Sequence, residues 1–251
     1  MTNSFQAVRF GHVSIGTGPV KVIVPLVGRT EAQLKKELSV AQDSTADLVE
    51  WRADYYNDPT QSALTSVAMT LRANAQKPLL LTLRTKKEGG ELTIEDEDYA
   101  QLVRYFAASG FADALDIEVR RAGAQTSAQL AHNASLPVVM SYHNFEKTPS
   151  AKTIASLFDE MASAGGDVLK IAVMPKTPDD VFTLMTSAYK AREKHQKPII
   201  AISMGSLGRI TRAAGALFGS AATFAALTEG SAPGQISATQ MQSLLKLFAI
   251  D

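Results

Sequence analysis

The chain has 251 residues, of which 45% are hydrophobic and 20% are charged, and its formal net charge at pH 7 is zero. These values are typical of a soluble globular protein, and they give no reason to expect nucleic acid or an anionic membrane as a partner. The sequence has no cysteine, which excludes disulfides, thiol nucleophiles and thiolate metal sites.

The N-terminus lacks a basic segment followed by an apolar run, and no apolar run in the sequence approaches the length of a membrane span. We therefore expect a cytoplasmic protein with no membrane partner. Residues 1–19 precede the first strong strand pattern, and we expect them to form a small hairpin that closes the bottom of the fold.

Short apolar segments recur along the chain, and each is nearly continuous in hydrophobicity rather than alternating. This pattern is typical of strands that are covered on both faces, as in a parallel sheet. In chain order, the predicted strands are 21–26, 48–52, 78–84, 114–119, 137–143, 168–173, 198–204 and 221–227. The last of these, AATFAAL, could equally be a helix.

Amphipathic, alanine-rich stretches lie between these segments and suit crossover helices. They are residues 31–42, 62–76, 94–109, 126–133, 150–164 and 178–196. Eight strands in about 250 residues predict the α/β class and a (β/α)8 TIM barrel, formed by one domain, residues 1–251. The alternative is an open doubly wound sheet, but no G-x-G-x-x-G motif follows any strand, so its dinucleotide-binding version has no support.

Polar residues recur at the C-terminal ends of the predicted strands, which is where a barrel carries its chemistry. They are Glu50, Arg52, Arg84, Asp116, Glu118, His143 and Lys170. A single charged residue at a strand end usually only begins a solvated loop, but here successive strands share the feature. We therefore expect a functional site at this end of the barrel.

Lys170 lies inside the apolar strand VLKIAV. Its head could reach a carboxylate or the solvent, or the amine could add to a carbonyl as a Schiff base, with burial and neighbouring cations disfavouring its protonated form. His143 ends the preceding strand and could be structural or a general acid–base. The residues alone leave both pairs of readings open, although neighbouring strands would place the two side chains side by side.

Three loops near these strand ends carry further candidates. Glu88, in KKEGGE, could fold back to orient His143. Arg209 and Arg212 follow the seventh strand, where anionic groups are often held, and the loop 231–235 (SAPGQ) could act as a lid. The sequence has no histidine spacing typical of a metal site, so we expect no metal, and it has no P-loop.

The chain resembles the type I 3-dehydroquinate dehydratases in motifs that extend over nearly its whole length. They are LVEWRAD (48–54), LTLRTKKEGGE (81–91), MSYHNFEKTP (140–149), LKIAVMP (169–175), ISMGSLGRITR (202–212), FGSAATF (218–224) and SAPGQI (231–236). The resemblance implies a (β/α)8 hydro-lyase of the shikimate pathway that removes water from 3-dehydroquinate to give 3-dehydroshikimate without a cofactor. It also suggests a homodimer.

By this resemblance, Lys170 matches the imine-forming lysine, His143 matches the general acid–base, and Glu88 matches the carboxylate that orients the histidine. Arg212 matches the residue that pairs with the substrate carboxylate, whereas Arg209 is not at the matched position. The other matched positions hold ring hydroxyls (Glu50, Arg52, Arg84), belong to the lid (Ser231, Gln235) or form an apolar wall (Met204, Phe224).

The chain departs from the family pattern at three positions. Pro25 ends the first strand where a small hydroxyl residue is common, Asn144 replaces a common aspartate, and Ile202 replaces a methionine. Two other functions are considered: a class I aldolase-type Schiff-base barrel and a non-catalytic barrel that binds sugar acids. The surrounding motifs speak against the first, and the intact set of reactive side chains speaks against the second.

Overall fold

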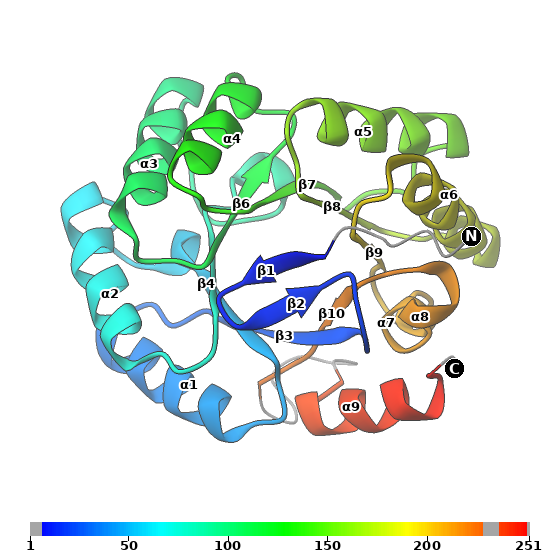
Figure 1. Cartoon of the computed structure of the whole chain (residues 1–251), viewed down its shortest axis with the longest axis horizontal. Coiled ribbons are helices and arrows are strands. Elements are labelled where there is room, and N and C mark those ends of the chain that lie inside the picture. Colours follow the sequence, from blue (N-terminus) through cyan, green and yellow to red (C-terminus); the bar gives the residue numbers. More distant parts are fainter. Residues whose placement is uncertain (1–6, 228–235, 250–251) are drawn as a thin grey trace.

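Eight parallel strands form the central sheet of the computed structural model, which describes residues 7–227 and 236–249. They follow one another in the order β10–β3–β4–β5–β6–β7–β8–β9 and surround the axis in the view of Figure 1. Their bounds are β3 Lys21–Leu26, β4 Leu48–Arg52, β5 Leu79–Thr82, β6 Ala114–Glu118, β7 Val138–Asn144, β8 Val168–Val173, β9 Ile199–Ser203 and β10 Ala222–Phe224.

The seam between β9 and β10 closes the ring. It consists of an isolated parallel bridge between Ile199 and Ser220, next to which the backbone N–H of Ala221 donates to the carbonyl of Ile199 at 2.7 Å. The predicted TIM barrel is therefore confirmed, and the open doubly wound sheet is wrong. The ambiguous segment AATFAAL contains a strand, although a shorter one than predicted.

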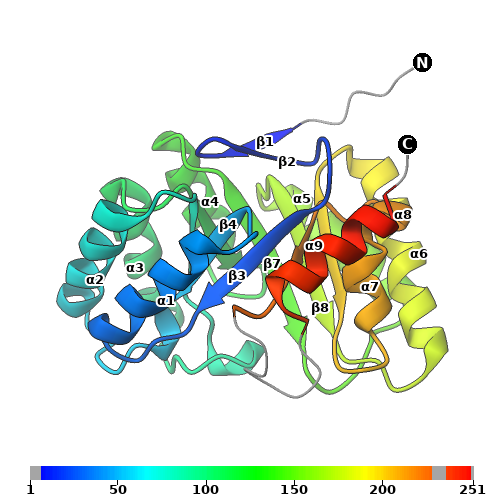
Figure 2. The ribbon, with the colours of Figure 1, turned by 90° about the horizontal axis from the view of Figure 1, so that it is seen from below.

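Helices cover the outside of the sheet (Figures 1 and 2). They are α1 Glu31–Asp43, α2 Gln61–Asn74, α3 Asp96–Ser109, α4 Ala124–Asn133, α5 Ala151–Ser163, α6 Pro178–His195, α7 Arg209–Ala213, α8 Gly215–Phe218 and α9 Ala238–Leu247, with single 3-10 turns η1 Ala53–Tyr55 and η2 Lys86–Glu88. The six predicted helices are confirmed, whereas α7, α8 and α9 were not predicted. None of the helices in the described ranges combines the length and hydropathy that a membrane crossing requires.

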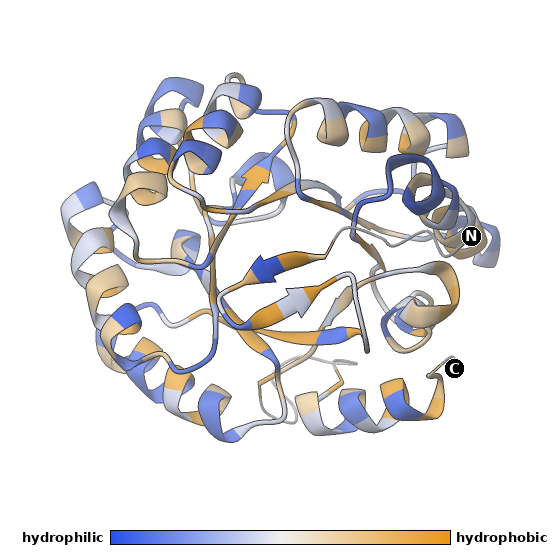
Figure 3. Ribbon diagram, in the orientation of Figure 1, coloured by the Kyte–Doolittle hydropathy of each residue, from blue (hydrophilic) through white to orange (hydrophobic). Residues whose placement is uncertain are grey.

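Local sequence explains where several helices begin. Thr30 and Thr177 open α1 and α6 with capping boxes, in which the threonine hydroxyl accepts from the backbone N–H three residues later. Ser150 caps α5 in the same way without the reciprocal bond. These caps satisfy N–H groups that have no partner within the helix. Figure 3 shows hydrophilic and hydrophobic residues alternating around the helices, as expected of helices that pack against the sheet with one side.

A two-stranded hairpin covers the N-terminal ends of the barrel strands. Its strands, β1 Val8–Phe10 and β2 Val13–Ile15, pair antiparallel and lie on one end of the barrel in Figure 2. Phe10 and Ile15 are buried against inward-facing side chains at the bottom of the barrel, Leu48 among them. The expected hairpin is therefore confirmed, and it seals the end opposite the predicted site.

Inward-facing side chains of the barrel change in character from bottom to top. Near the hairpin they are apolar, with Leu48, Leu80, Val139 and Val168 in one buried cluster. Because side chains alternate along a strand, the residue two positions further along each strand faces the same interior. These next residues are Glu50, Thr82, Ser141 and Lys170, and the same alternation on β6 gives Asp116 after Ala114.

Candidate active site

A cavity of about 170 Å³ opens at the C-terminal ends of the strands. Nine of the eleven residues predicted for the site line it: Glu50, Arg52, Arg84, Glu88, His143, Lys170, Met204, Arg212 and Phe224. Ser231 and Gln235, predicted for the lid, lie outside the described residues. Arg209 is exposed and does not line the cavity.

The wall of this cavity has a polar half and an apolar half. Most of the charged and basic side chains come from β4, β8, the end of β7 and the segment after β5. Ile202, Met204 and Phe224 come from β9, β10 and the segment between them, and so does one cation, Arg212 of α7. Pro25 of β3, which departs from the family pattern, also lines the cavity. The cavity therefore presents most of its charge on one side of a bound molecule, and an apolar surface with a single arginine on the other.

Lys170 lies in the middle of β8 with only 3% of its surface exposed. Its Nζ is 2.9 Å from Oδ2 of Asp116 and 3.6 Å from Oε1 of Glu50, and it lies 4.6 Å from the centroid of the Phe224 ring. A buried ammonium needs such partners, because burial without them is costly. We expected cations near this amine, and Arg52, Arg84 and Arg212 do line the same cavity, but the charged groups closest to Nζ are carboxylates. The amine is thus paired and also lines the cavity.

Arg84 follows β5 and is buried within a group of acidic side chains. Its Nη2 is 2.7 Å from Oδ1 of Asp116, while Nη1 is 3.3 Å from Oε1 of Glu118 and 3.4 Å from Oε2 of Glu88. Nη1 also donates to Oγ of Ser141 at 2.9 Å. Arg84 therefore connects residues from three neighbouring parts of the barrel mouth.

The charge on Asp116 is fixed by these contacts. Burial by itself would raise the pKa of Asp116, but Arg84 and Lys170 together outweigh this effect and lower the pKa below its usual range. The carboxylate thus stays ionised at neutral pH. Two cations and one hydroxyl share its two oxygens, because Ser141 donates to Oδ1 at 2.6 Å.

His143 and Glu88 form a buried pair at the edge of the cavity. Oε2 of Glu88 is 2.9 Å from Nδ1 of His143 and also accepts the backbone N–H of His143 at 3.0 Å. Burial lowers the pKa of His143 well below its usual range, and the positive charges of Arg84 and Lys170 act in the same direction. A neutral imidazole that donates from Nδ1 leaves Nε2 free to accept a proton.

Glu88 has a raised pKa, chiefly because of burial, although Arg84 opposes the change. Its second oxygen, Oε1, is buried and has no hydrogen-bond partner among the described residues. An unpaired buried oxygen favours the neutral carboxyl group, since burial penalises charge. Both bonds to His143, one from the ring and one from the backbone N–H, are therefore made by Oε2 alone.

The two glycines of KKEGGE have steric roles. Gly89 ends η2 with φ of 78°, and a Cβ added there would collide with the ring of Phe145, which also lines the cavity. A Cβ on Gly90 would collide with the backbone carbonyl of Arg84. Residues without a Cβ at positions 89 and 90 let the chain pass close to Phe145 and Arg84, and Glu88 next to them contacts His143.

Arg212 differs from the other arginines of the site. Its Nη1 donates to the backbone carbonyl of Phe224 at 3.1 Å, and no carboxylate of the described part of the chain forms an ion pair with it. Burial lowers the pKa of Arg212, and no nearby charge offsets this. By contrast, Arg52 is held by two 2.8 Å bonds to Asp54. A partly buried guanidinium without a carboxylate partner is suited to bind an anionic group of a ligand.

The sequence interpretation gave no role to Asp116, Glu118 or Ser141. Both acidic residues were noted at the end of the predicted strand ALDIEV, and their spacing of two was a signal that they share one face. Their convergence on Arg84 could not be seen, because it depends on the relative heights of β5, β6 and β7 in the barrel. Asp116 contacts both Lys170 and Arg84, and Glu118 contacts Arg84, so these carboxylates lie beneath the two cations of the site.

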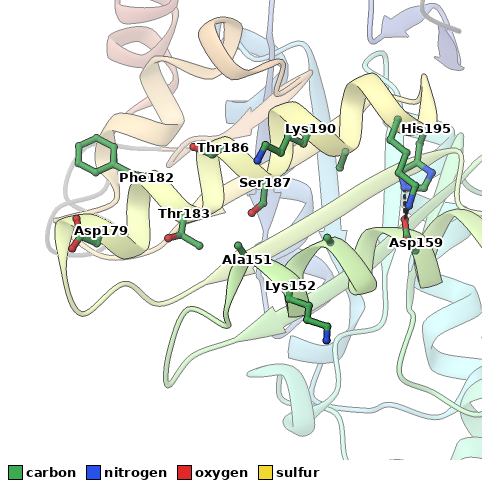
Figure 4. A pocket seen from close by; sticks show the side chains of 13 residues that line it. Ala151, Lys152, Asp159, Asp179, Phe182, Thr183, Thr186, Ser187, Lys190 and His195 are labelled. Carbon is green, nitrogen blue, oxygen red and sulfur yellow. Dashed lines mark hydrogen bonds and ion pairs between the residues drawn. The ribbon is translucent and has the colours of Figure 1, made fainter.

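A larger cavity, of about 650 Å³, lies between α5 and α6 on the outside of the barrel (Figure 4). Its walls carry small residues such as Thr183 and Ser187, and Asp159 pairs there with Lys194 at 2.6 Å and with His195 at 2.9 Å. None of the residues predicted for the site lines it. We therefore place the chemistry in the smaller cavity.

In the described ranges, there is no cluster of histidine, aspartate and glutamate side chains that could hold a metal ion.

Comparisons with known proteins agree on one family. Residues 22–251 match the family model of type I 3-dehydroquinase. The chain is 41% identical to the 3-dehydroquinate dehydratase of Listeria monocytogenes over 241 residues, covering 94% of this chain and 96% of that protein. A crystal structure of type I 3-dehydroquinate dehydratase from Clostridium difficile, with covalently modified comenic acid, superposes with a TM-score of 0.93 at 34% identity and covers 96% of this chain and 97% of that one. A 3-dehydroquinate dehydratase from Enterococcus faecalis gives a TM-score of 0.87 at 37% identity, covering 94% and 97% of the two chains.

Proposed function

The chain belongs to the type I 3-dehydroquinase family and is a 3-dehydroquinate dehydratase of the shikimate pathway, and we propose that it removes water through an imine at Lys170. One observation supports this proposal most strongly. Lys170 and His143 line one cavity together with Arg212, which forms no ion pair with a carboxylate of the described residues. The aldolase-type and non-catalytic alternatives have no support from these comparisons.

In the proposed reaction, the ammonium of Lys170 gives up one proton and the resulting amine attacks the C3 ketone of 3-dehydroquinate. Return of that proton and loss of water give a protonated imine. The cationic imine withdraws electrons, so that the C2 proton becomes acidic enough for the neutral imidazole of His143 to remove it. The same proton then leaves with the C1 hydroxyl as water. Hydrolysis of the imine releases 3-dehydroshikimate and regenerates the amine.

The substrate is proposed to lie between the two halves of the cavity. Its carboxylate binds Arg212, which has no carboxylate partner of its own among the described residues. Its ring hydroxyls bind Glu50, Arg52 and Arg84 on the polar half, and its apolar ring face lies on Met204 and Phe224. Ser231 and Gln235 are proposed as lid contacts from the sequence alone.

The remaining parts of the proposal also come from the sequence and its resemblance. They are one domain over residues 1–251, a cytoplasmic homodimer, no cofactor, no metal and no nucleic-acid or membrane partner. The homodimer is tested by light scattering of the purified protein, for which we expect twice the mass of the 26.9 kDa chain. A monomer at all concentrations would refute this part only.

The imine is tested by borohydride reduction in the presence of 3-dehydroquinate, followed by peptide mass mapping. We expect one reduced adduct, located on Lys170. The matched control is Lys197→Ala, because Lys197 lies at the opposite end of the barrel with its Nζ on the carbonyl of Gly166. The adduct should persist in this control and disappear in Lys170→Ala; an adduct elsewhere, or none, would refute the mechanism.

A further inference from the structure

Asp116 connects the two buried cations of the site. Its Oδ2 accepts from Nζ of Lys170 at 2.9 Å, and its Oδ1 accepts from Nη2 of Arg84 at 2.7 Å and from Oγ of Ser141 at 2.6 Å. Only 3% of its surface is exposed. Three donors from three neighbouring strands or strand ends thus fix both oxygens of one carboxylate.

Asp116 lies behind the cavity rather than in its wall. Lys170 and Arg84 line the cavity, whereas Asp116 does not. Its influence on a bound molecule therefore passes through Nζ of Lys170 or through the guanidinium of Arg84. Glu50, the other carboxylate near Nζ, differs in this respect, because it lines the cavity, lies further from Nζ at 3.6 Å and accepts from Thr82 at 2.8 Å.

We propose that Asp116 is a positioning residue for the imine chemistry: it aims Nζ of Lys170 into the cavity and stays the counterion of that nitrogen when the amine becomes a protonated imine. This inference rests on the proposed function. Before the reaction the ammonium donates one of its three hydrogens to Oδ2. After addition to the ketone and loss of water, the imine nitrogen keeps one hydrogen and a positive charge, and Oδ2 can accept that hydrogen instead.

The charge of Asp116 suits this role better than the role of a base. A proton must leave the ammonium before it attacks the ketone, but Arg84 and Lys170 hold the pKa of Asp116 below its usual range, so this carboxylate takes up protons poorly. A fixed negative charge beside the cationic nitrogen acts during every step in which the imine withdraws electrons. Preorganised charges of this kind need no rearrangement during the reaction.

The test compares Asp116→Asn with Ser141→Ala. The first removes the charge beside Nζ. The second removes the bonds that Ser141 makes to Oδ1 and to Arg84 and leaves the contact with Lys170, so it reports on the Arg84 side alone. For Asp116→Asn we expect kcat and the rate of borohydride trapping on Lys170 to fall about 100-fold, the size of effect seen when one preorganised electrostatic partner is removed. KM should change less than about threefold, since Asp116 does not line the cavity. Ser141→Ala should keep both rates within about fivefold of the unchanged protein.

A loss of folded protein would also lower the apparent kcat at an unchanged KM, so both rates are expressed per folded molecule, with the folded fraction measured by urea unfolding. A deficit that remains after this correction identifies the positioning role. Trapping by Asp116→Asn at the rate of the unchanged protein would overturn the inference. If Asp116→Asn does not fold, Asp116→Glu decides the question, because it keeps the charge and displaces it by one methylene. We expect this variant to trap at least about tenfold more slowly, and an unchanged rate would refute positioning. Absence of any Lys170 adduct in the unchanged protein would instead refute the proposed mechanism itself.

Discussion

Glu88 holds His143 through a single oxygen, which is 2.9 Å from the ring Nδ1 and 3.0 Å from the backbone nitrogen. The imidazole therefore cannot rotate without breaking the bond at Nδ1, while the backbone bond keeps Glu88 in place. This arrangement fixes which ring nitrogen faces the cavity. It also makes the protonation of His143 depend on buried neighbours rather than on solvent.

The first prediction concerns the pH dependence of the reaction. Burial, with Arg84 and Lys170, lowers the pKa of His143, so the imidazole stays neutral at pH values where an exposed histidine is protonated. A base with a lowered pKa moves the acidic limb of kcat/KM to lower pH. We therefore expect this limb to lie below about pH 6.5, the ordinary histidine value. A limb centred at or above that value, measured with 3-dehydroquinate, would contradict the assignment of His143 as the base.

Replacing His143 should separate imine formation from elimination. His143→Ala removes the base proposed for the C2 proton but leaves Lys170 and its carboxylates in place. We expect turnover to fall by about 10²–10⁴-fold, while the imine can still be trapped on Lys170 by borohydride. His195→Ala is the control, because His195 pairs with Asp159 on the outside of the barrel. Near-normal turnover in His143→Ala would show that another group moves the proton.

Arg212 should control substrate binding through the substrate carboxylate. Hydrogen bonds to charged groups contribute about 1.5–3 kcal/mol, so Arg212→Gln should raise KM about 10- to 100-fold. Arg209→Gln is a close control, because Arg209 is exposed and is not part of the cavity wall. Its KM should stay within about twofold of the unchanged protein. Equal effects of the two substitutions would point to general attraction by positive charge rather than to a specific contact.

Gly89 should tolerate a side chain less well than another glycine of the same backbone conformation. Gly89 and Gly110 both have positive φ, at 78° and 72°, but a Cβ meets the Phe145 ring only at Gly89 and meets nothing within 4 Å at Gly110. Gly110→Ala should lower the free energy of unfolding by about 1 kcal/mol. Gly89→Ala should lower it by about 1–3 kcal/mol more, which is the usual cost of overpacking. Urea unfolding measures both. Equal losses would mean that Phe145 moves aside freely.

The free energy of unfolding should depend on Asp116 at acidic pH. The pKa of Asp116 is lower in the folded protein than in the unfolded chain, so its contribution is complete above the unfolded value of about 3.9 and is lost as the pH falls towards the folded value. The stability difference between the unchanged protein and Asp116→Asn should therefore shrink by about 1–3 kcal/mol between about pH 5 and pH 2. A constant difference over this range would show that Asp116 is not preferentially ionised in the folded state.

The fold could be predicted from periodicity because each strand of this barrel is covered on both faces. Segments such as VLKIAV and PLLLTL are apolar except for one polar residue each, and the helices between them show hydrophobicity with a period near that of an α-helix. The short helices α7 and α8 escaped prediction, since five and four residues are too few to show a period. Helix α9 lies after the last predicted strand, in a part of the sequence for which no helix is predicted.

The sequence predicts which residues form the site better than it predicts which charged groups surround them. Lys170, His143 and Arg212 could be found because their strands and motifs are recognisable in the sequence. The surroundings of Lys170 could not, because the contact with Asp116 joins β6 to β8 across an intervening strand and depends on the stagger of the barrel. Sequence reasoning expected cations near the amine and did not find the carboxylates that lie closest to it.

The single bridge between Ile199 and Ser220 gives the barrel one weak side. The strands that flank this seam, β9 and β10, lead to Ile202 and Phe224 on the apolar half of the cavity, while longer ladders join β6, β7 and β8 beneath the charged half. Backbone amides along the seam should therefore exchange with deuterated water sooner than those around Lys170. Local opening at the seam would then move Phe224 and Arg212, which are proposed to bind the substrate, and leave Lys170 and His143 in place.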